Sequence, residues 1–375
     1  MPPLNAVIRS SVDYGKSKDV ELVGIVKGWQ GLLECDTLDL NELVLDPAIG
    51  GTVLKSSRVN LAKVDNAHSK AKKNLDSLHL DGLIVIGGED TLSNAFHLVD
   101  IPQVLISKTI DNDVGINEAG RIVNYFTLGY PTAAEKISSF VSLKEGLRTT
   151  AYSHERIIVV ESMGMHAGWL ALASTMGHSD FIIIPEFPLD YDLFMEKVAD
   201  RYREEKNVVI VVSEGARWIR GDYISADESE KDAFGHPKFR GAADLLARRL
   251  KKDLAARFET KNVNSVNPSY LYRSGKPNKL DHESAYLLGK EAVNLFLSGI
   301  AQPVFLTLEP TSDGFRTETF DLKRLNTIED FHRFVDERYY DKDEYRVTEE
   351  GKSYLGRIIP DIEEVPYGMR LEEHE

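Results

Sequence analysis

The sequence has very little cysteine, a single residue at position 35 among 375. One cysteine excludes an intrachain disulfide, which fits a reducing compartment, and we expect Cys35 to be an inert packing residue. Long apolar runs are also absent, since none approaches the ~20 residues of a membrane-spanning helix. The N-terminus has no signal-peptide core. We therefore expect a cytoplasmic protein without membrane segments.

Positive charge is scarce as well. Lys and Arg total 45 against 60 Asp and Glu, so the formal net charge is −15. This balance argues against a general nucleic-acid binder, because phosphate backbones need clustered cations, and against docking on anionic membranes. The familiar nucleotide, zinc and hydrolase signatures are missing, and Ser10 stands where a P-loop ending at Gly15-Lys16-Ser17 needs its first glycine.

Buried-strand patterns, by contrast, are plentiful. Hydrophobic residues make up 42% of the chain, which at this length fits two packed lobes and an appendage. Five apolar runs rich in Ile and Val do not alternate with polar residues, as expected for parallel strands covered on both faces. These runs are Gly82–Ile86, Gln103–Ile106, Arg156–Val160, Phe181–Ile184 and Val208–Val212.

Helical patterns lie between several of these runs. Thr132-x-x-Glu135 predicts a capping box for a helix that runs toward Arg148. Helical spacing also covers Leu193–Arg203 and Ala242–Phe258. Strands that alternate with helices predict an α/β fold.

Polar or glycine-rich loops directly follow four of the five runs. They are Gly87–Thr91, Lys108–Asp113, Glu161–Gly168 and Ser213–Gly215. Because ligands of open parallel sheets bind outside the carboxyl ends of the strands, the four loops predict one binding crevice. His154, His166 and His236 are scattered, and we expect them to be core or surface residues.

The first two loops suit phosphoryl transfer onto an alcohol, which needs a metal site, a cation and a base. Gly87-Gly88 would let the backbone approach phosphate, and Glu89 or Asp90 could hold Mg²⁺. Asp111 and Asp113 are candidates for a general base. Lys108 could neutralise charge on the phosphoryl group.

With these residues in view, the chain resembles the 6-phosphofructokinases of the bacterial A type, and among them the pyrophosphate-dependent branch. The resemblance runs from Leu4 to about Leu308. Its landmarks are Gly87–Thr91, Thr109–Asp113, Ser153–Arg156, Met163–Gly168, Ser213–Gly215, Asp232–Pro237 and Tyr270–Arg273. It implies two similar three-layer α/β lobes with mainly parallel sheets and an active site in the cleft between them.

The resemblance also implies how the chain is divided. Residues 1–135 and 272–303 would form the donor-binding lobe, and residues 136–271 and 304–322 the sugar-phosphate-binding lobe. Residues 323–375 would be a charged extension whose Tyr339-Tyr340 pair covers an interface. Relatives usually carry a strand and a glycine-rich phosphate loop ahead of the segment that begins at Leu4, where this sequence has three residues.

Residue roles follow from the same resemblance. Asp111 would remove the proton from the sugar hydroxyl, with Thr109 and Asp113 around the reacting groups, and Glu89 would hold Mg²⁺. The donor would meet Arg58, Gly88, Asp90 and Thr91. The sugar phosphate would meet Arg156, Met163, Gly164, Met165, Glu214, Tyr270 and Arg273. Arg156 would be shared across the interface of a homodimer or homotetramer.

Position 90 indicates the donor. The ATP-using members typically have glycine where this chain has Asp90, whereas pyrophosphate users have aspartate there and lysine where Lys108 stands. A carboxylate at this point would repel the α-phosphate of ATP. The resemblance therefore implies reversible phosphorylation of fructose 6-phosphate by pyrophosphate, a glycolytic reaction.

Three alternatives stay open: ATP as the donor, another ketose phosphate such as sedoheptulose 7-phosphate as the acceptor, or a non-catalytic paralogue that binds sugar phosphates. Met165 stands where relatives usually have arginine, which favours the last alternative. Asn264, with Lys261 nearby, replaces a cation that reaches a neighbour's sugar phosphate, so the sugar affinity is expected to be weak.

Overall fold

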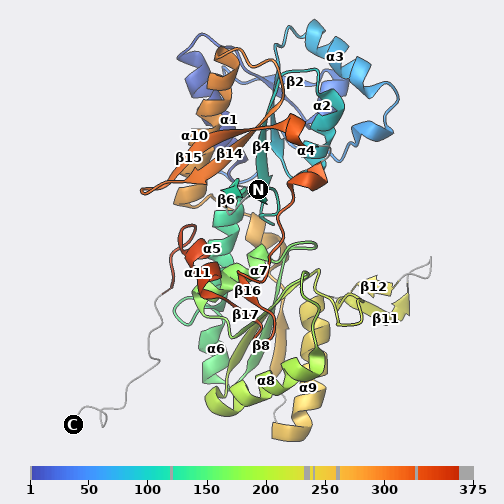
Figure 1. The fold of residues 1–375 in the computed structure, drawn as a ribbon, viewed down its shortest axis with the longest axis vertical. Coiled ribbons are helices and arrows are strands. Elements are labelled where there is room, and N and C mark those ends of the chain that lie inside the picture. Colours follow the sequence, from blue (N-terminus) through green and yellow to red (C-terminus); the bar gives the residue numbers. More distant parts are fainter. Residues whose placement is uncertain are drawn as a thin grey trace. The chain divides into compact units, whose positions relative to one another are not determined.

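The structure is a computed structural model, and it describes residues 2–118, 121–231, 237–239, 241–258, 262–325 and 328–362. The chain divides into two compact units. Unit 1 consists of Met1–Thr132 and Arg273–Arg333, and unit 2 consists of Ala133–Tyr272 and Phe334–Glu375. Each unit is built around a sheet with parallel strands and flanking helices, so the predicted α/β class is confirmed (Figure 1).

The sheet of unit 1 has the strand order β15-β14-β4-β3, and β7 pairs with the end of β4. The strands β3, β4, β7 and β14 run parallel, whereas β15 is antiparallel to β14. Their bounds are β3 Leu83–Gly87, β4 Gln103–Thr109, β7 Leu128–Gly129, β14 Val304–Pro310 and β15 Phe315–Asp321. All seven residues of β4 are buried, as expected for a central parallel strand.

Helices cover this sheet, and α1 and α10 lie side by side (Figure 1). Apolar residues of α2, α3 and α4 form one core with β3, β4, β14 and β15. The helices of unit 1 are α1 Leu4–Lys16, α2 Trp29–Glu34, α3 Ala67–Ser77, α4 Glu89–Ala95 and α10 Lys279–Leu297. Two small antiparallel pairs are β1 Val23–Ile25 with β2 Thr37–Asp39, and β5 Ile116–Glu118 with β6 Arg121–Val123.

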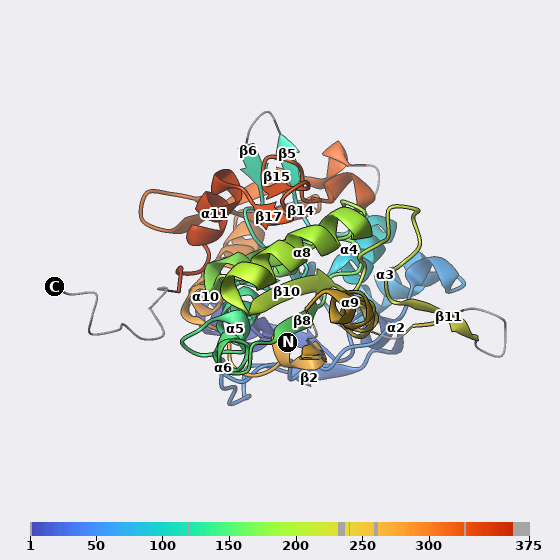
Figure 2. The same cartoon turned by 90° about the horizontal axis from the view of Figure 1, so that it is seen from below.

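The sheet of unit 2 has the order β13-β8-β10-β9 and is wholly parallel. Its strands are β8 Ile157–Ser162, β9 Phe181–Ile183, β10 Val208–Ser213 and β13 Val263–Val266. Its helices are α5 Tyr130–Val141, α6 Arg148–Ser153, α7 Trp169–Ala173, α8 Tyr191–Glu205, α9 Ala242–Phe258 and α11 Glu349–Gly356. The helix α8 lies across β10 (Figure 2). Two hairpins pair β11 Ala226–Lys231 with β12 Pro237–Phe239, and β16 Tyr340–Asp341 with β17 Arg346–Val347.

All five predicted strands are present, as are the helices predicted over 193–203 and 242–258. The helix predicted to run toward Arg148 is shorter, because α5 ends at Val141. The chain then turns so tightly that a Cβ atom on Gly146 would lie 2.2 Å from the carbonyl oxygen of Phe140. The glycine permits this turn, and a separate helix, α6, begins at Arg148.

The predicted capping box at Thr132 is wrong. The helix α5 begins two residues earlier, at Tyr130, and its first amides are bound by a side chain from another helix. The buried carboxylate of Asp281 in α10 accepts hydrogen bonds from Gly129 N at 2.7 Å and from Thr132 N at 2.9 Å. Its sequence distance of about 150 residues made this cap invisible to a local pattern.

One predicted domain assignment is also wrong. Residues 304–322 belong to unit 1, and not to the sugar-phosphate lobe, because β14 pairs with β4 through Val304↔Val104 and the next two residue pairs. The chain thus passes between the units at three points, and the last crossing follows Arg333.

The described residues of the predicted extension after Arg333, 334–362, belong to unit 2. Tyr339 and Tyr340 are each 2% exposed, and the Tyr340 hydroxyl donates to Ile182 O at 2.6 Å. The Tyr339 ring lies 5.2 Å from that of Trp169. The tyrosine pair therefore belongs to the core of unit 2.

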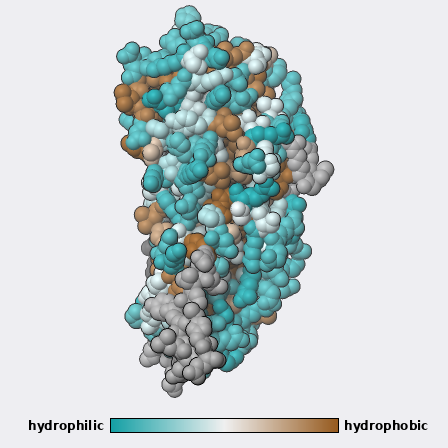
Figure 3. Space-filling model, turned by 90° about the vertical axis from the view of Figure 1, so that its left-hand side faces the viewer, coloured by the Kyte–Doolittle hydropathy of each residue, from teal (hydrophilic) through white to brown (hydrophobic). Residues whose placement is uncertain are grey.

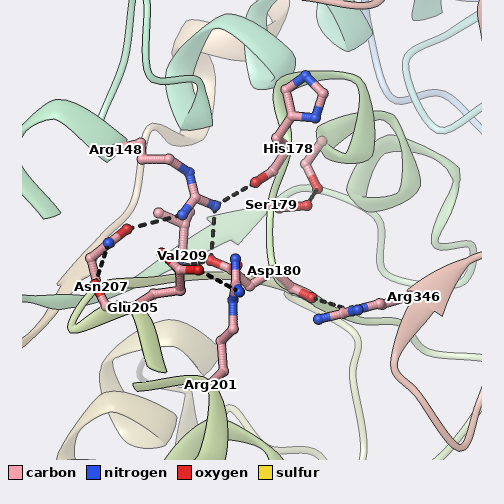
Figure 4. Close-up of polar contacts among 10 residues, drawn as sticks. Arg148, His178, Ser179, Asp180, Arg201, Glu205, Asn207, Val209 and Arg346 are labelled. Atoms are coloured by element: carbon pink, nitrogen blue, oxygen red, sulfur yellow. Dashed lines mark hydrogen bonds and ion pairs between the residues drawn. The ribbon is translucent and has the colours of Figure 1, made fainter. Parts of the chain in front are cut away.

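A buried ionic network also fixes this segment (Figure 4). The Asp180 carboxylate accepts hydrogen bonds from Arg148 at 2.8 Å, Arg201 at 2.9 Å and Val209 N at 2.8 Å. Arg346 of β17 donates to the Asp180 carbonyl oxygen at 3.1 Å. Because each oxygen of this buried carboxylate is paired, the network stabilises one arrangement of β9, β10 and β17.

The surface is mixed. On the face shown in Figure 3, hydrophilic residues predominate and hydrophobic residues are interspersed among them. Among the described residues, no helix is long and apolar enough to cross a membrane. The prediction that Cys35 packs in the interior is wrong, because this residue follows α2 with φ 55° and is exposed.

Candidate functional site

In unit 1, the predicted loops lie at neighbouring strand ends. The strands β3 and β4 pair in parallel, with Gly87 opposite Ser107, so the turn after β3 and the end of β4 share one edge of the sheet. A Cβ atom on Gly88 would lie 3.7 Å from Lys108 O, an ordinary contact. A Cβ atom on Gly87 would lie 2.4 Å from the Cβ of Thr91. The first glycine is therefore required by the packing of its own turn.

The acidic pair begins the helix α4, directly after Gly88. Asp90 is exposed, whereas the side chain of Glu89 is 37% exposed. The Trp29 indole of α2 donates to Thr91 O at 3.0 Å and so fixes the first turn of this helix. Both carboxylates are thus accessible at the edge where β3 ends.

The segment that carries Arg58 is bound to the same helix. Asn94 of α4 donates to Val59 O at 3.1 Å, and its side-chain oxygen accepts from Leu61 N at 2.7 Å. Arg58 itself is exposed. The fold therefore brings the chain around Arg58 against α4, although the two are more than 30 residues apart.

Lys108 occupies an unusual environment at the end of β4. It is 8% exposed, and burial is the main cause that lowers its pKa to about 8. The positive charge of Arg273 lowers the pKa further, while Asp111 and Asp281 raise it. Near neutral pH the side chain is an ammonium in a poorly solvated place, which suits it to bind a phosphoryl group.

The loop after β4 is tightly turned. Asp111 N donates to the Thr109 hydroxyl at 3.1 Å, and the buried Asn112 has φ 56°, a left-handed conformation that asparagine tolerates. Thr127 binds both Thr109 and Asn112 of this loop. Its N–H donates to the Asn112 side-chain oxygen at 3.0 Å, and its hydroxyl donates to Thr109 O at 2.7 Å. Asp111 remains half-buried.

Asp113 and Glu89 form a like-charged pair that fits a divalent cation. Burial, and next the charge of Glu89, raise the pKa of Asp113 to about 6, while Arg333 opposes the shift. Among the described residues, the buried Oδ1 atom of Asp113 has no hydrogen-bond partner. No cluster of three or more metal-ligating side chains occurs in the described part of the chain. Mg²⁺ needs only one or two carboxylates and keeps its waters, so the pair fits this ion.

Two residues of this site were missed by the sequence analysis. His332 Nε2 lies 3.6 Å from the Glu89 carboxylate. Arg333, which is 1% exposed, donates to Asn112 O at 3.0 Å. Both lie in the predicted extension, and Arg333 is 221 residues from Asn112, so no local motif could have indicated them.

In unit 2, the loop after β8 and the end of β10 come together. Ser213 and Ser162 are paired at the strand ends, and Gly164 N donates to the Glu214 carboxylate at 3.1 Å. Gly164 has φ 123°, and a Cβ atom there would lie 2.4 Å from Ala167 O. Only glycine fits this turn. Met163 adjoins it and is half-buried.

The remaining sugar-site predictions are placed as follows. Met165 is 41% exposed and Tyr270 is 65% exposed, both in unit 2. Arg273 falls in unit 1, where it acts on Lys108. Asn264 is exposed in β13. The 232–236 part of the Asp232–Pro237 landmark and the predicted neighbour Lys261 lie outside the described residues.

Arg156 is separated from the rest of the predicted sugar site within its own chain. It precedes β8, whereas Met163 follows it, so the six residues of the strand put them about 20 Å apart. Its guanidinium donates to the Thr150 hydroxyl at 2.9 Å. His154 and His166 are exposed, which agrees with the expectation that they are core or surface residues.

The comparison with known families agrees with this geometry. The sequence model of the family described as Phosphofructokinase matches residues 1–296, about four fifths of the chain. The chain belongs to the phosphofructokinase family.

Similar phosphofructokinases are named for two donors. The chain is 38% identical over 304 residues to the pyrophosphate–fructose 6-phosphate 1-phosphotransferase of Dictyoglomus thermophilum, covering 80% of this chain and 82% of that one. It is also 38% identical over 303 residues to ATP-dependent 6-phosphofructokinase 3 of Streptomyces coelicolor, covering 78% and 83%. Sequence identity therefore shows a phosphofructokinase without deciding its donor.

Solved structures show the same fold. The pyrophosphate-dependent phosphofructokinase of Nitrosospira multiformis matches with a TM-score of 0.78 at 20% identity, over 100% of this chain and 93% of that one. The pyrophosphate-dependent phosphofructokinase of Marinobacter aquaeolei matches with a TM-score of 0.76 at 19% identity, over 98% and 91%. At this identity the likeness concerns the phosphofructokinase fold alone.

Proposed function

We propose that this phosphofructokinase transfers a phosphoryl group reversibly from pyrophosphate to the 1-hydroxyl of fructose 6-phosphate. The products are fructose 1,6-bisphosphate and phosphate. One observation carries the proposal: Asp90 lies in the first turn of α4, after β3, and the buried Lys108 lies next to the last residue of the neighbouring strand β4. A carboxylate and a poorly solvated ammonium thus flank the place where the donor would bind.

The charge of Asp90 favours the smaller donor. Two unit charges 4 Å apart repel by about 1 kcal/mol in water and about 4 kcal/mol at an effective dielectric constant of 20. Asp90 is exposed, so the lower value applies until a bound donor displaces water. The α-phosphate of ATP would meet this repulsion, whereas pyrophosphate has no third phosphate. The Dictyoglomus thermophilum relative, named for pyrophosphate, supports this choice.

In the proposed reaction, Asp111 accepts the proton of the sugar 1-hydroxyl. The hydroxyl oxygen then bonds to phosphorus as the bond to the leaving phosphate breaks. Lys108, protonated below pH 8, stabilises the charge on the transferring group. Glu89, with Asp113 beside it, would hold Mg²⁺, which neutralises charge on the phosphate oxygens.

The sugar phosphate would bind the loops at the carboxyl ends of β8 and β10. Met163, Gly164 and Glu214 contribute there, and Tyr270 and Arg273 are further candidates. The position of Arg156 at the opposite end of β8 supports a role for it in the site of a second copy of the chain. Such sharing requires at least a homodimer.

An assay of the two donors tests the proposal. With Mg²⁺ and saturating fructose 6-phosphate, we expect kcat/KM for pyrophosphate to exceed that for ATP by about a hundredfold or more. ATP is the second candidate, because the Streptomyces coelicolor relative at equal identity is named for it. A preference for ATP would overturn the donor, and turnover only with sedoheptulose 7-phosphate would overturn the acceptor. Binding of fructose 6-phosphate without turnover would identify a non-catalytic paralogue.

A further inference from the structure

The last stretch of unit 1, Phe331–Arg333, lies beyond the residues that the family model matches, yet it pairs with the chain just after the predicted catalytic loop. We call it the clamp segment. Gly115 N donates to Phe331 O at 2.9 Å, and Arg333 N donates to Asp113 O at 2.7 Å. Between them, Val114 and His332 form an antiparallel bridge. The clamp segment thus lies antiparallel to residues 113–115, directly after the predicted catalytic loop.

The Arg333 guanidinium binds three residues at once. Nη2 donates to Asn112 O at 3.0 Å and to Asn112 Oδ1 at 2.8 Å. Nη1 donates to Asn124 O at 2.9 Å and to Tyr125 O at 3.0 Å. A permanently charged, planar fork is suited to this task, because it fixes several acceptors in one geometry.

The orientation of Asn112 determines where the two neighbouring carboxylates lie. Asn112 stands between Asp111 and Asp113 in a left-handed conformation, so a change in its orientation would move both carboxylates. Its Oδ1 atom accepts hydrogen bonds from the Arg333 guanidinium and from Thr127 N, so the turn is bound to the clamp segment and to the residue that precedes β7. A general base that is misplaced by about 1 Å loses much of its effect.

We propose that Arg333 is a positioning residue for phosphoryl transfer, acting through Asn112 to hold Asp111 and Asp113 in place. The proposal rests on the proposed function, since it takes the loop to be catalytic. Arg333 itself is buried behind the turn and has no role as a ligand of the substrates. The predicted extension therefore supplies part of the active site from beyond the residues that the family model matches.

Kinetics of Arg333→Lys, Asn112→Gly and the double variant test this role. Lysine keeps the charge but loses the fork, and glycine keeps the left-handed conformation but loses Oδ1. We expect each single change to lower kcat with pyrophosphate about ten- to hundredfold, with KM for both substrates within about threefold of wild type. The double variant should have a kcat no more than about threefold below that of the slower single variant, because both changes remove the same contact between Arg333 and Asn112 Oδ1.

The matched control is Arg316→Met, which removes an arginine of β15 whose side chain is 62% exposed and pairs with Glu318 at 2.8 Å. It should retain the wild-type kcat. A folded Arg333→Lys enzyme with kcat within about threefold of wild type, or a double variant in which the two losses multiply, would overturn the proposal. If Arg333→Lys does not fold, Asn112→Gly takes its place in the test. A kcat of Asn112→Gly within about threefold of wild type would then overturn the proposal.

Hydrogen exchange separates this proposal from the proposed function. In the protein without substrates, Arg333→Lys should speed exchange of the Thr127 amide about tenfold or more and leave the amides of β14 unchanged. If wild type turns over neither donor but the exchange changes as expected, the proposed function fails and the loop contact stands. Unchanged exchange at Thr127 would refute the contact even in an active enzyme.

Discussion

At the scale of single residues, the proposed function assigns the choice of donor to Asp90. Replacing it by glycine removes the charge and the side chain, so we predict that Asp90→Gly lowers KM for ATP by about tenfold or more. Asp90→Asn is the matched control, since it keeps the size and removes only the charge. Steady-state kinetics with both donors measure the effect. If neither variant gains activity with ATP, the carboxylate is not what excludes this donor.

Lys108 gives the enzyme a specific dependence on pH. Its pKa is lowered to about 8, mainly by burial, so the ammonium that we propose stabilises the transferring group is lost as pH rises through 8. We predict that kcat/KM for pyrophosphate falls about tenfold for each pH unit above that value.

Pyrophosphate also ionises in this range, and Lys108→Arg provides the control. Arginine stays protonated throughout, so the variant should be slower but should lack the part of the alkaline decline that belongs to the lysine. The same alkaline profile in both enzymes would assign the decline to the substrate.

Site residues in the turn directly after a strand were predictable from the sequence, because an acid, a glycine or a lysine at a strand end has a direct chemical meaning. The loops after β3 and β4 were found in this way. His332 and Arg333 could not be, since a burial that depends on tertiary pairing leaves no mark on the sequence around it. Gly87 shows a second limit. The sequence analysis explained this glycine by the approach of a phosphate, whereas the structure shows that its close packing against Thr91 already requires glycine.

At the scale of elements, the turn after β8 depends on one glycine. Alanine at position 164 would require φ 123° and would place its Cβ 2.4 Å from Ala167 O. We predict that Gly164→Ala lowers stability by about 2–4 kcal/mol and raises KM for fructose 6-phosphate about tenfold. Thermal unfolding and kinetics measure the two effects.

Gly356→Ala is the matched control for that change. Gly356 ends α11 in the same unit, and a Cβ atom there meets nothing within 4 Å, so the variant should be neutral. Equal melting temperatures for the two alanine variants would contradict the strain assigned to the turn.

Strands and long helices were predicted well, because burial on both faces and helical spacing are properties of the segment itself. The two ends of α5 were not. The start of α5 is set by Asp281, and its end by the tight turn at Gly146, and both causes lie outside the repeating pattern of the helix.

At the scale of the whole molecule, Glu186 links the segment after Arg333 to the loop that precedes α7. Its carboxylate accepts from Val335 N at 2.9 Å and from Gly168 N at 3.0 Å, and burial raises its pKa to about 7. A carboxyl group with a raised pKa binds a proton on folding, so its stabilising effect is present below pH 4.5 and is lost as pH rises to about 7.

We predict that Glu186→Gln flattens the fall in unfolding free energy between pH 4.5 and 7 by roughly 1–3 kcal/mol. Denaturant unfolding at several pH values measures this difference, and the comparison with wild type cancels the other titrating groups. Parallel curves for the two proteins would show that Glu186 does not titrate in this window.

The order in which the strands are synthesised has a consequence for how this chain folds. Every strand of the unit 2 sheet lies between Ile157 and Val266, so that sheet can close while the chain is still emerging from the ribosome. The unit 1 sheet cannot, because β4 must wait for β14, which is made some 200 residues later. Until then β4 has an open edge with the apolar residues Val104–Ile106 at its centre, and this interval is when the nascent protein most needs a chaperone.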